Sequence, residues 1–163
     1  AALTGHLVLS SLHTNDAPST ITRLIDIGAQ PYLVGATLLG VLAQRLVRTL
    51  CPHCKAPAEV DRDAWERLIA PARTRVPESI YKPVGCDECR HTGYLGRIGI
   101  YETLFADKAI RKLINTTNDL QLYYDAAEKQ GMHNLRISGA QKVAKGLTTL
   151  EEIYSVVPPQ KET

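Results

Sequence analysis

The chain has 163 residues, 44% of them hydrophobic, which is enough for one packed domain with a small appendage. Its net charge of +2 at pH 7 is too small to indicate nucleic-acid binding by itself. The longest apolar run, residues 32–43, is too short to span a bilayer. We therefore expect a globular domain that has no transmembrane segment and no nucleic acid among its partners.

A short apolar run near the start, residues 7–9, predicts a buried strand of a parallel sheet. Polar residues follow it. Because ligands gather at the carboxyl ends of strands in open α/β sheets, His13, Thr14 and Asn15 are candidate site residues. The alternative is that Asn15 or Asp16 only caps the next helix. The two roles are compatible, since a helix N-terminus can also bind an anion.

Two helices and a strand are predicted next. The apolar spacing predicts a helix over about 17–27 and a second helix from Pro31, which is apolar on nearly all sides and should be buried. Residues 41–50 then predict a strand, in which we expect Arg45 and Arg48 to be exposed positions. Contact of these arginines with an anion is the less favoured interpretation.

The four cysteines form two C-x-x-C pairs, with 31 residues between the pairs. Each pair places two thiolates on one side of a tight turn, and two such turns supply the sulfur ligands that tetrahedral zinc prefers. We therefore expect a structural Zn²⁺ bound by Cys51, Cys54, Cys86 and Cys89. Two disulfides or a redox pair are the alternatives, but the sequence has no secretory signal, and two redox motifs around one small segment have no evident use.

Residues 51–92 are predicted to be a zinc module, inserted between the strand over 41–50 and a returning strand within 93–106 that lies beside it. Asp61 or Asp63 can cap a short helix in this module. Because so short a segment has little core of its own, we expect the metal to hold it together. We also expect the module to unfold while the flanking core persists.

The remainder is predicted to be helical. Side-chain oxygens that can cap successive helices belong to Asp107, Asp119 and Thr148 or Thr149, and another helix is expected over about 134–145. Pro158 and Pro159 are expected to end the ordered structure.

Three stretches resemble a known family. Residues 4–15, Thr-Gly-His-Leu-Val-Leu-Ser-Ser-Leu-His-Thr-Asn, are similar to the His box of the secretion ATPase superfamily. Residues 43–54 and 86–102, which contain the C-x-x-C pairs, resemble the assembly ATPases of type II secretion and type IV pili. The resemblance covers nearly the whole chain. The tetracysteine element is absent from the pilus-retraction members, which disfavours that branch.

The resemblance implies the fold class α/β, as the C-terminal half of a RecA-like P-loop ATPase domain with an inserted tetracysteine zinc module and a C-terminal helical bundle. Four segments follow from it. They are the C-terminal part of the RecA-like core over 1–50, the zinc module over 51–92, the returning core strand over 93–106 and the helical subdomain over 107–163.

The resemblance also implies a function. Members form cytoplasmic homo-hexamers, peripheral to the inner membrane, that bind ATP with Mg²⁺ and drive assembly of a pilin-like filament. Their partners are the inner-membrane platform and cytoplasmic adaptor proteins of the machine. By resemblance, His13 senses or positions the γ-phosphate, Thr14 and Asn15 support it, and the four cysteines bind zinc. Type II secretion through a pseudopilus is the leading hypothesis, and pilus extension is the alternative.

The chain departs from the family pattern because it contains no G-x-x-x-x-G-K-[ST] motif. The phosphate cradle and its lysine are therefore missing. We expect this chain to be a piece of a longer ATPase and to be inactive alone. A zinc-ribbon interaction or nucleic-acid-binding module is the alternative from another class, and the acidic pair Asp87 and Glu88 disfavours it.

Overall fold

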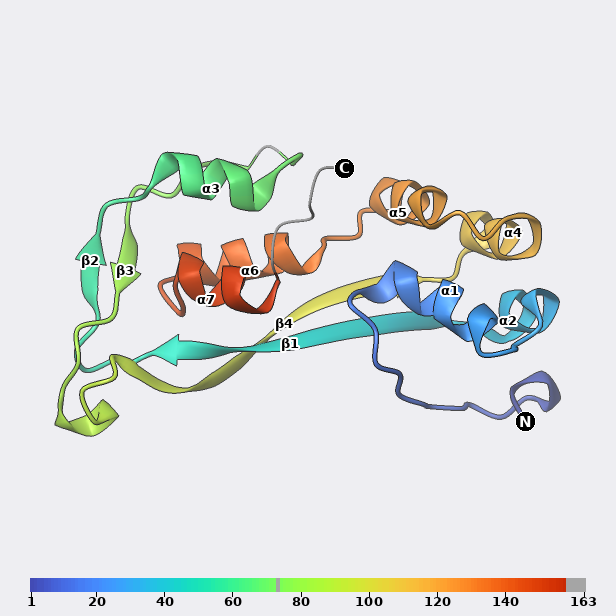
Figure 1. Cartoon of the computed structure of the whole chain (residues 1–163), viewed down its shortest axis with the longest axis horizontal. Helices are drawn as coiled ribbons and strands as arrows, with labels where there is room; N and C mark the ends of the chain where they lie inside the picture. The colour runs from blue at the N-terminus through green and yellow to red at the C-terminus, as the bar shows by residue number, and fades with distance from the viewer. Residues whose placement is uncertain (73, 158–163) are drawn as a thin grey trace. The chain divides into compact units, whose positions relative to one another are not determined.

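The computed structural model of the chain describes residues 1–72 and 74–157 (Figure 1). These residues form two compact units. Unit 1 consists of residues 1–43 and 102–134, and unit 2 consists of residues 44–101 with the described residues from 135 onward. The four segments expected from the sequence stay a prediction. The predicted end of the ordered structure, at Pro158 and Pro159, lies outside the described residues.

Strands β1 (Gly40–Leu50) and β4 (Tyr94–Phe105) are hydrogen-bonded neighbours in a two-stranded sheet (Figure 1). At one end of the pair the N–H of Ala106 donates to the carbonyl of Leu39, and at the other the N–H of Cys51 donates to the carbonyl of Gly93. These partners require the strands to be antiparallel. The prediction that the returning strand lies beside the strand over 41–50 is confirmed.

The predicted strand at residues 7–9 is wrong. Residues 6–14 form neither helix nor strand, and Leu7, Val8 and Leu9 are 74%, 54% and 87% exposed. An isolated strand leaves its backbone groups unpaired and buries no face, and no strand of the described residues pairs with this run. The coarse α/β class is confirmed, but the expected parallel sheet is not formed within residues 1–72 and 74–157.

Unit 1 packs helices around one end of the β1–β4 pair. Its helices are α1 (Ala17–Asp26), α2 (Pro31–Thr37), α4 (Lys108–Thr116) and α5 (Leu120–Lys129), preceded by the short 3₁₀ helix η1 (Ala2–Thr4). Its buried core consists of Ala17, Ile21, Val34, Ala43, Leu104, Ala106, Ile110, Ile114, Tyr123 and Ala127. The expectation that α2 is buried on nearly all sides is wrong, because Tyr32 is 64% exposed and only Val34 and Gly35 are fully buried.

The predicted helix caps are confirmed by hydrogen bonds. Asp61 caps α3 (Arg62–Ile69), Asp107 caps α4 and Asp119 caps α5, each by accepting a first-turn N–H at 2.9 Å. Thr149 caps α7 (Leu150–Val156) in the same way, accepting the N–H of Glu152. Such a cap contributes about 1 kcal/mol, and this local chemistry explains why the helix starts agree with expectation.

Unit 2 contains residues 51–92, which include the four cysteines and are called the cysteine segment below. Besides α3 and α7 it has α6 (Leu135–Ala144), the 3₁₀ helix η2 (Asp87–Cys89), and the antiparallel strands β2 (Ala56–Ala58) and β3 (Ile80–Lys82). Its buried core consists of Val47, Trp65, Leu68, Ile69, Ile80, Ile100, Leu135, Ile137, Ala140, Val143, Leu150 and Ile153. The α3 residues of the cysteine segment therefore share one core with β1, β4, α6 and α7, which argues against its unfolding as a separate module.

Arg48 is more than an exposed strand position. Its Nε donates to Oε1 of Glu152 at 2.9 Å, its backbone N–H donates to Oε2 at 3.0 Å, and its guanidinium lies 4.1 Å from the centre of the Tyr94 ring. The hydrogen bonds from Arg48 lower the pKa of the Glu152 carboxyl in spite of its burial. This contact joins β1 and β4 to α7. The predicted exposure of Arg48 is confirmed, since its side chain is 52% exposed, but the less favoured contact with an anionic group is also present.

The loop between α6 and α7 is bound to the start of the cysteine segment. The N–H of Leu50 donates to the carbonyl of Leu147 at 2.9 Å, and Nζ of Lys55 donates to the carbonyl of Gly146 at 2.7 Å. These two hydrogen bonds therefore attach the α6–α7 loop to the residues that flank the first pair of cysteines.

No helix of the described residues is long and apolar enough to cross a membrane.

Candidate metal centre and the His13 segment

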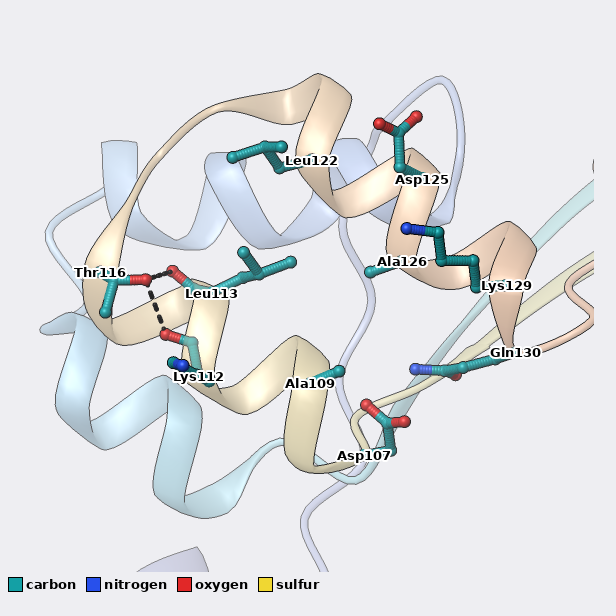
Figure 2. A pocket seen from close by; sticks show the side chains of 10 residues that line it. All are labelled: Asp107, Ala109, Lys112, Leu113, Thr116, Leu122, Asp125, Ala126, Lys129 and Gln130. Carbon is teal, nitrogen blue, oxygen red and sulfur yellow. Dashed lines mark hydrogen bonds between the residues drawn. The ribbon is translucent and has the colours of Figure 1, made fainter.

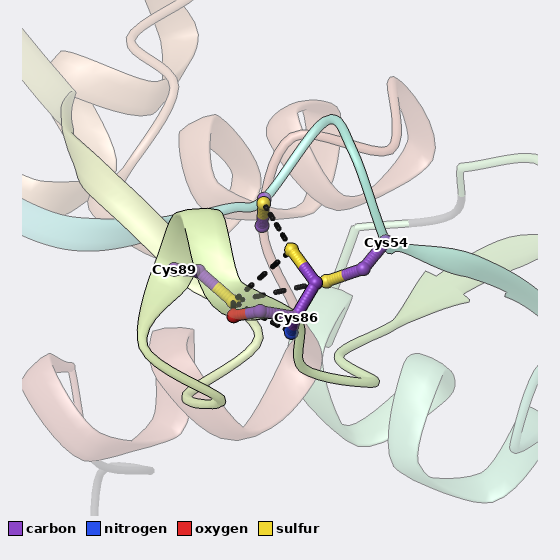
Figure 3. Close-up of side chains that lie close together, drawn as sticks. Cys54, Cys86 and Cys89 are labelled. Carbon is purple, nitrogen blue, oxygen red and sulfur yellow. Dashed lines mark hydrogen bonds between the residues drawn. The ribbon is translucent and has the colours of Figure 1, made fainter.

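The four cysteines predicted as metal ligands converge on one point in unit 2 (Figure 3). All four Sγ atoms lie within 4.8 Å of one another. The separations are 3.9 Å for Cys51 and Cys86, 3.9 Å for Cys54 and Cys89, and 3.8 Å for Cys86 and Cys89. Sulfurs placed tetrahedrally about 2.3 Å from a zinc ion are roughly 3.8 Å apart, so the cluster fits that ion.

The same distances exclude the disulfide alternative in this structure. Bonded sulfurs lie about 2.05 Å apart, whereas all four cysteines are free thiols here. Cys51 and Cys89 are buried, and Cys54 and Cys86 are partly buried. Because all four ligand positions of a tetrahedral ion would come from protein sulfur, the arrangement is typical of a structural site rather than a catalytic one.

Backbone amides are aimed at the sulfurs. The N–H of Gly85 donates to Sγ of Cys54 at 3.3 Å, and the N–H groups of Cys86 and Gly93 each donate to Sγ of Cys89 at 3.2 Å. Gly93 has φ +76° and an added Cβ would collide with Pro83, so this turn needs glycine. The sequence Cys86 to Gly93 thus folds into a loop whose amides stabilise negative charge on sulfur.

The thiols have divergent proton affinities. Burial disfavours the thiolate of Cys89, but hydrogen bonds from the amides of Cys86 and Gly93 and from the thiols of Cys86 and Cys54 together lower the pKa of Cys89 to about 6. At Cys86 the amide of Cys89 favours the thiolate, but burial and the thiols of Cys89 and Cys54 raise the pKa. Four adjacent sulfurs cannot all ionise without a neutralising charge, which a divalent cation would supply.

His13 and its neighbours lie in unit 1. His13 and Asn15 are exposed, and Thr14 is partly buried. The Thr14 hydroxyl donates to the carbonyl of Asp16 at 3.1 Å and lies 2.8 Å from the hydroxyl of Thr20. The structure therefore presents the His13 imidazole to solvent, while it places Thr14 against the first turn of α1.

The start of α1 is occupied by side chains of this chain. Oδ1 of Asp16 accepts the N–H of Ser19 at 2.8 Å, and Oε1 of Glu102 accepts the N–H of Ala17 at 2.7 Å. The hydroxyl of Tyr124 donates to Oδ2 of Asp16 at 2.6 Å. Because Pro18 has no N–H, these contacts use the first amides of the helix, and the cap prediction for Asp16 is confirmed.

Glu102 and Tyr124 were not among the residues predicted from the sequence. Glu102 is only 3% exposed and stands in the apolar strand pattern Ile-Tyr-Glu-Thr-Leu over residues 100–104. A carboxylate is rarely buried without a partner, so an acid at an inward position of a strand is the signal that could have drawn attention to it.

A pocket of about 530 Å³ lies between α4 and α5 in unit 1 (Figure 2). It is lined by apolar side chains such as Ala109, Leu113 and Ala126 and by charged side chains such as Lys112 and Asp125. None of the residues predicted for catalysis, nucleotide binding or metal binding lines it. Its shape alone therefore does not identify the functional site.

Comparison with known proteins agrees with the motifs. The family described as "Type II/IV secretion system protein" matches residues 1–155. The type IV pilus assembly ATPase TfpB of Acinetobacter baylyi is 57% identical over 158 residues, which cover 97% of this chain and 27% of that protein.

Two further relatives represent both branches of the family. The type IV pilus assembly ATPase PilB of Myxococcus xanthus is 47% identical, over 99% of this chain and 29% of its own length. The type II secretion system ATPase E of Vibrio cholerae is 46% identical, over 96% of this chain and 30% of its own length. The chain spans less than a third of each of these relatives, and it belongs to the type II/IV secretion system protein family.

Proposed function

We propose that this chain is the C-terminal part of the ATPase that powers type II protein secretion by assembling a pseudopilus. The observation that carries the proposal is the family match over residues 1–155, joined to relatives that are named secretion or pilus ATPases. In this proposal the remaining strands of a RecA-like sheet and the phosphate-binding loop belong to the part of the protein outside this chain. They would supply the sheet that residues 7–9 lack here.

Extension of a type IV pilus is the second candidate. It is favoured by the identity of 57% to the pilus assembly ATPase of Acinetobacter baylyi, compared with 46% to the secretion ATPase of Vibrio cholerae. Both functions rest on the same process, in which ATP hydrolysis drives the assembly of a pilin-like filament from a membrane platform.

The proposed role of His13 is to contact the γ-phosphate of ATP. A neutral imidazole donates one hydrogen bond and a protonated imidazole donates two, and a phosphate oxygen is a suitable acceptor. The exposure of His13 leaves its ring accessible to a ligand. Binding of the other phosphates and of Mg²⁺ would rest on the missing loop, so His13 should act on turnover more than on affinity. Thr14 and Asn15 would support it from the start of α1.

The proposed metal is Zn²⁺ held by Cys51, Cys54, Cys86 and Cys89. The sulfur separations of 3.8 and 3.9 Å support this assignment. When bound, the ion would neutralise the clustered thiolates and stabilise the fold. The amides of Gly85 and Gly93 donate hydrogen bonds to the cysteine sulfurs and so orient these sulfurs as metal ligands.

The assembled protein is proposed to be a homo-hexamer in the cytoplasm, attached peripherally to the inner membrane through platform and adaptor proteins. The absence of a membrane-spanning helix among the described residues is compatible with that placement. A zinc-ribbon nucleic-acid module is less well supported, because Asp87 and Glu88 beside the cysteine cluster would repel phosphates.

The test is deletion of the gene that encodes the whole protein, followed by measurement of exported protein and of surface pili. Loss of export with pili intact would support secretion, and loss of pili with export intact would support pilus extension. If both remain normal, the proposed function is wrong. Purified whole protein should hydrolyse ATP, whereas the 163-residue chain alone should not.

A further inference from the structure

The two contacts that fix the start of α1 come from residues far away in sequence. Glu102 belongs to β4 and Tyr124 to α5, yet they bind the N–H of Ala17 and the carboxylate of Asp16. All of these residues lie within unit 1. The position of the first turn of α1 is therefore set by the sheet and by a neighbouring helix, in addition to its own cap.

Charge strengthens both of these hydrogen bonds. A carboxylate at a helix N-terminus is stabilised by the helix dipole, and a hydrogen bond with an ionised partner is stronger than a neutral one. Burial, the hydrogen bond to Asp16 and the charge of Glu102 all raise the pKa of Tyr124, so its hydroxyl keeps the proton that it donates.

These residues are poorly suited to touch a nucleotide themselves. Glu102 is only 3% exposed and its negative charge would repel phosphate. Both oxygens of Asp16 are engaged, one by the N–H of Ser19 and the other by the hydroxyl of Tyr124. Any influence on a bound nucleotide must therefore pass through the chain segment that they hold.

That segment carries His13. Only Thr14 and Asn15 separate His13 from Asp16, and Thr14 is itself bound to the first turn of α1 through Asp16 and Thr20. Residues 6–12, immediately before His13, form no helix or strand. The chain is therefore held by hydrogen bonds directly after His13, where Thr14 contacts the first turn of α1.

We propose that Glu102 and Tyr124 are positioning residues, which hold the first turn of α1 and through it set the place of the His13 imidazole. The proposal rests on the proposed function, in which His13 contacts the γ-phosphate. A shift of about 1 Å in a reacting group can cost roughly a hundredfold in rate. Glu102 and Tyr124 therefore influence turnover without contacting ATP.

The test uses the whole protein and measures kcat and KM for ATP. Tyr124→Phe, which is nearly isosteric, and Glu102→Ala should each lower kcat by about tenfold or more, with KM changed by less than about twofold. Glu102→Gln keeps an acceptor for the N–H of Ala17 and should restore most of the lost turnover. Combined with His13→Ala, neither change should lower kcat further, because both act through His13.

Two variants serve as matched controls. Tyr123→Phe removes the hydroxyl of the neighbouring buried tyrosine in α5, whose hydrogen bond goes to the carbonyl of Thr117. Asp107→Ala removes another carboxylate of unit 1 that accepts a first-turn amide, the N–H of Ile110 at the start of α4, and so matches Glu102→Ala. Both controls should leave kcat unchanged.

The outcomes separate the two proposals. If His13→Ala lowers kcat but Tyr124→Phe and Glu102→Ala behave like the controls, the positioning proposal is wrong and the proposed function stands. If Glu102→Ala lowers kcat equally with and without His13, the residue does not act through His13 and the proposal is also wrong. If His13→Ala leaves turnover intact, the role of His13 in the proposed function fails.

Discussion

The two units of the chain hold their candidate sites in different ways. In unit 2 the four cysteines come together within the chain, and one hydrophobic core surrounds the segment that carries them. In unit 1 the start of α1 is fixed by Glu102 and Tyr124, but His13 is exposed and residues 6–14 have no regular structure. A metal site needs only its ligands, whereas the nucleotide site proposed here needs parts of the protein outside this chain. The first can be tested on this chain and the second cannot.

Removal of the metal is expected to have the largest effect on stability. Structural zinc contributes about 10–16 kcal/mol in small peptides, and less where a larger core supports the site. Because α3 shares its core with α6 and α7, chelation should raise hydrogen exchange over residues 44–101 and 135–157 together. Unit 1 should be affected less.

His53 provides the control for that experiment. It lies between Cys51 and Cys54 but is exposed, so His53→Ala should retain one equivalent of zinc by elemental analysis, while Cys51→Ser should not. Exchange that rises only within residues 51–92 would instead support the independent module expected from the sequence. Protein purified without chelator that contains no zinc would refute the metal assignment.

Loss of the Arg48–Glu152 contact should have an intermediate effect on unit 2. The pKa of Glu152 is lowered by its hydrogen bonds with Arg48, so its ionised form stabilises the folded state. This stabilisation is present above the ordinary carboxyl pKa of about 4.3 and is lost as the pH falls through the lower pKa of the folded state. Glu152→Gln should cost about 1–3 kcal/mol at pH 7.

The pH dependence isolates this contribution. The difference in unfolding free energy between the original chain and Glu152→Gln should be constant near neutral pH and should shrink below about pH 4.3. Denaturant unfolding measured at several pH values gives this difference directly. A difference that does not change with pH would mean that the charge of Glu152 is unimportant.

The smallest expected effect is at a helix cap of unit 1. Asp119→Ala removes the acceptor for the N–H of Gln121 at the start of α5 and should cost about 1 kcal/mol. Asp125 lies on the same helix and accepts only a side-chain hydrogen bond from Gln121, so Asp125→Ala should cost about 0.2–0.5 kcal/mol. Equal losses in thermal unfolding would show that the cap has no special role.

Local chemistry was predictable from the sequence. The caps at Asp107, Asp119 and Thr149 depend on a few neighbouring residues, and so do the C-x-x-C turns. Contacts between distant residues were not predictable. The strand pattern does not indicate that Arg48 binds Glu152, because an alternating position can face either solvent or a helix that is distant in the sequence.

The errors have physical causes as well. The run at residues 7–9 has the composition of a buried strand, but burial requires partner strands, and the described residues provide none. The cysteine segment was expected to have little core, but Trp65 and Leu68 of α3 pack into the core of unit 2. In both cases the sequence pattern describes what a segment can bury and does not say against what.

The measurement that tests the central claim most directly is the turnover of the whole protein with His13→Ala. We expect kcat for ATP hydrolysis to fall by roughly 10²–10³, the loss typical of removing one transition-state donor, while ATP binding changes little. His133→Ala is the matched control, because His133 is another exposed histidine of unit 1 and lies outside residues 4–15, and it should retain normal turnover. Turnover of His13→Ala within about a factor of two of the original protein, well outside that range, would contradict the account.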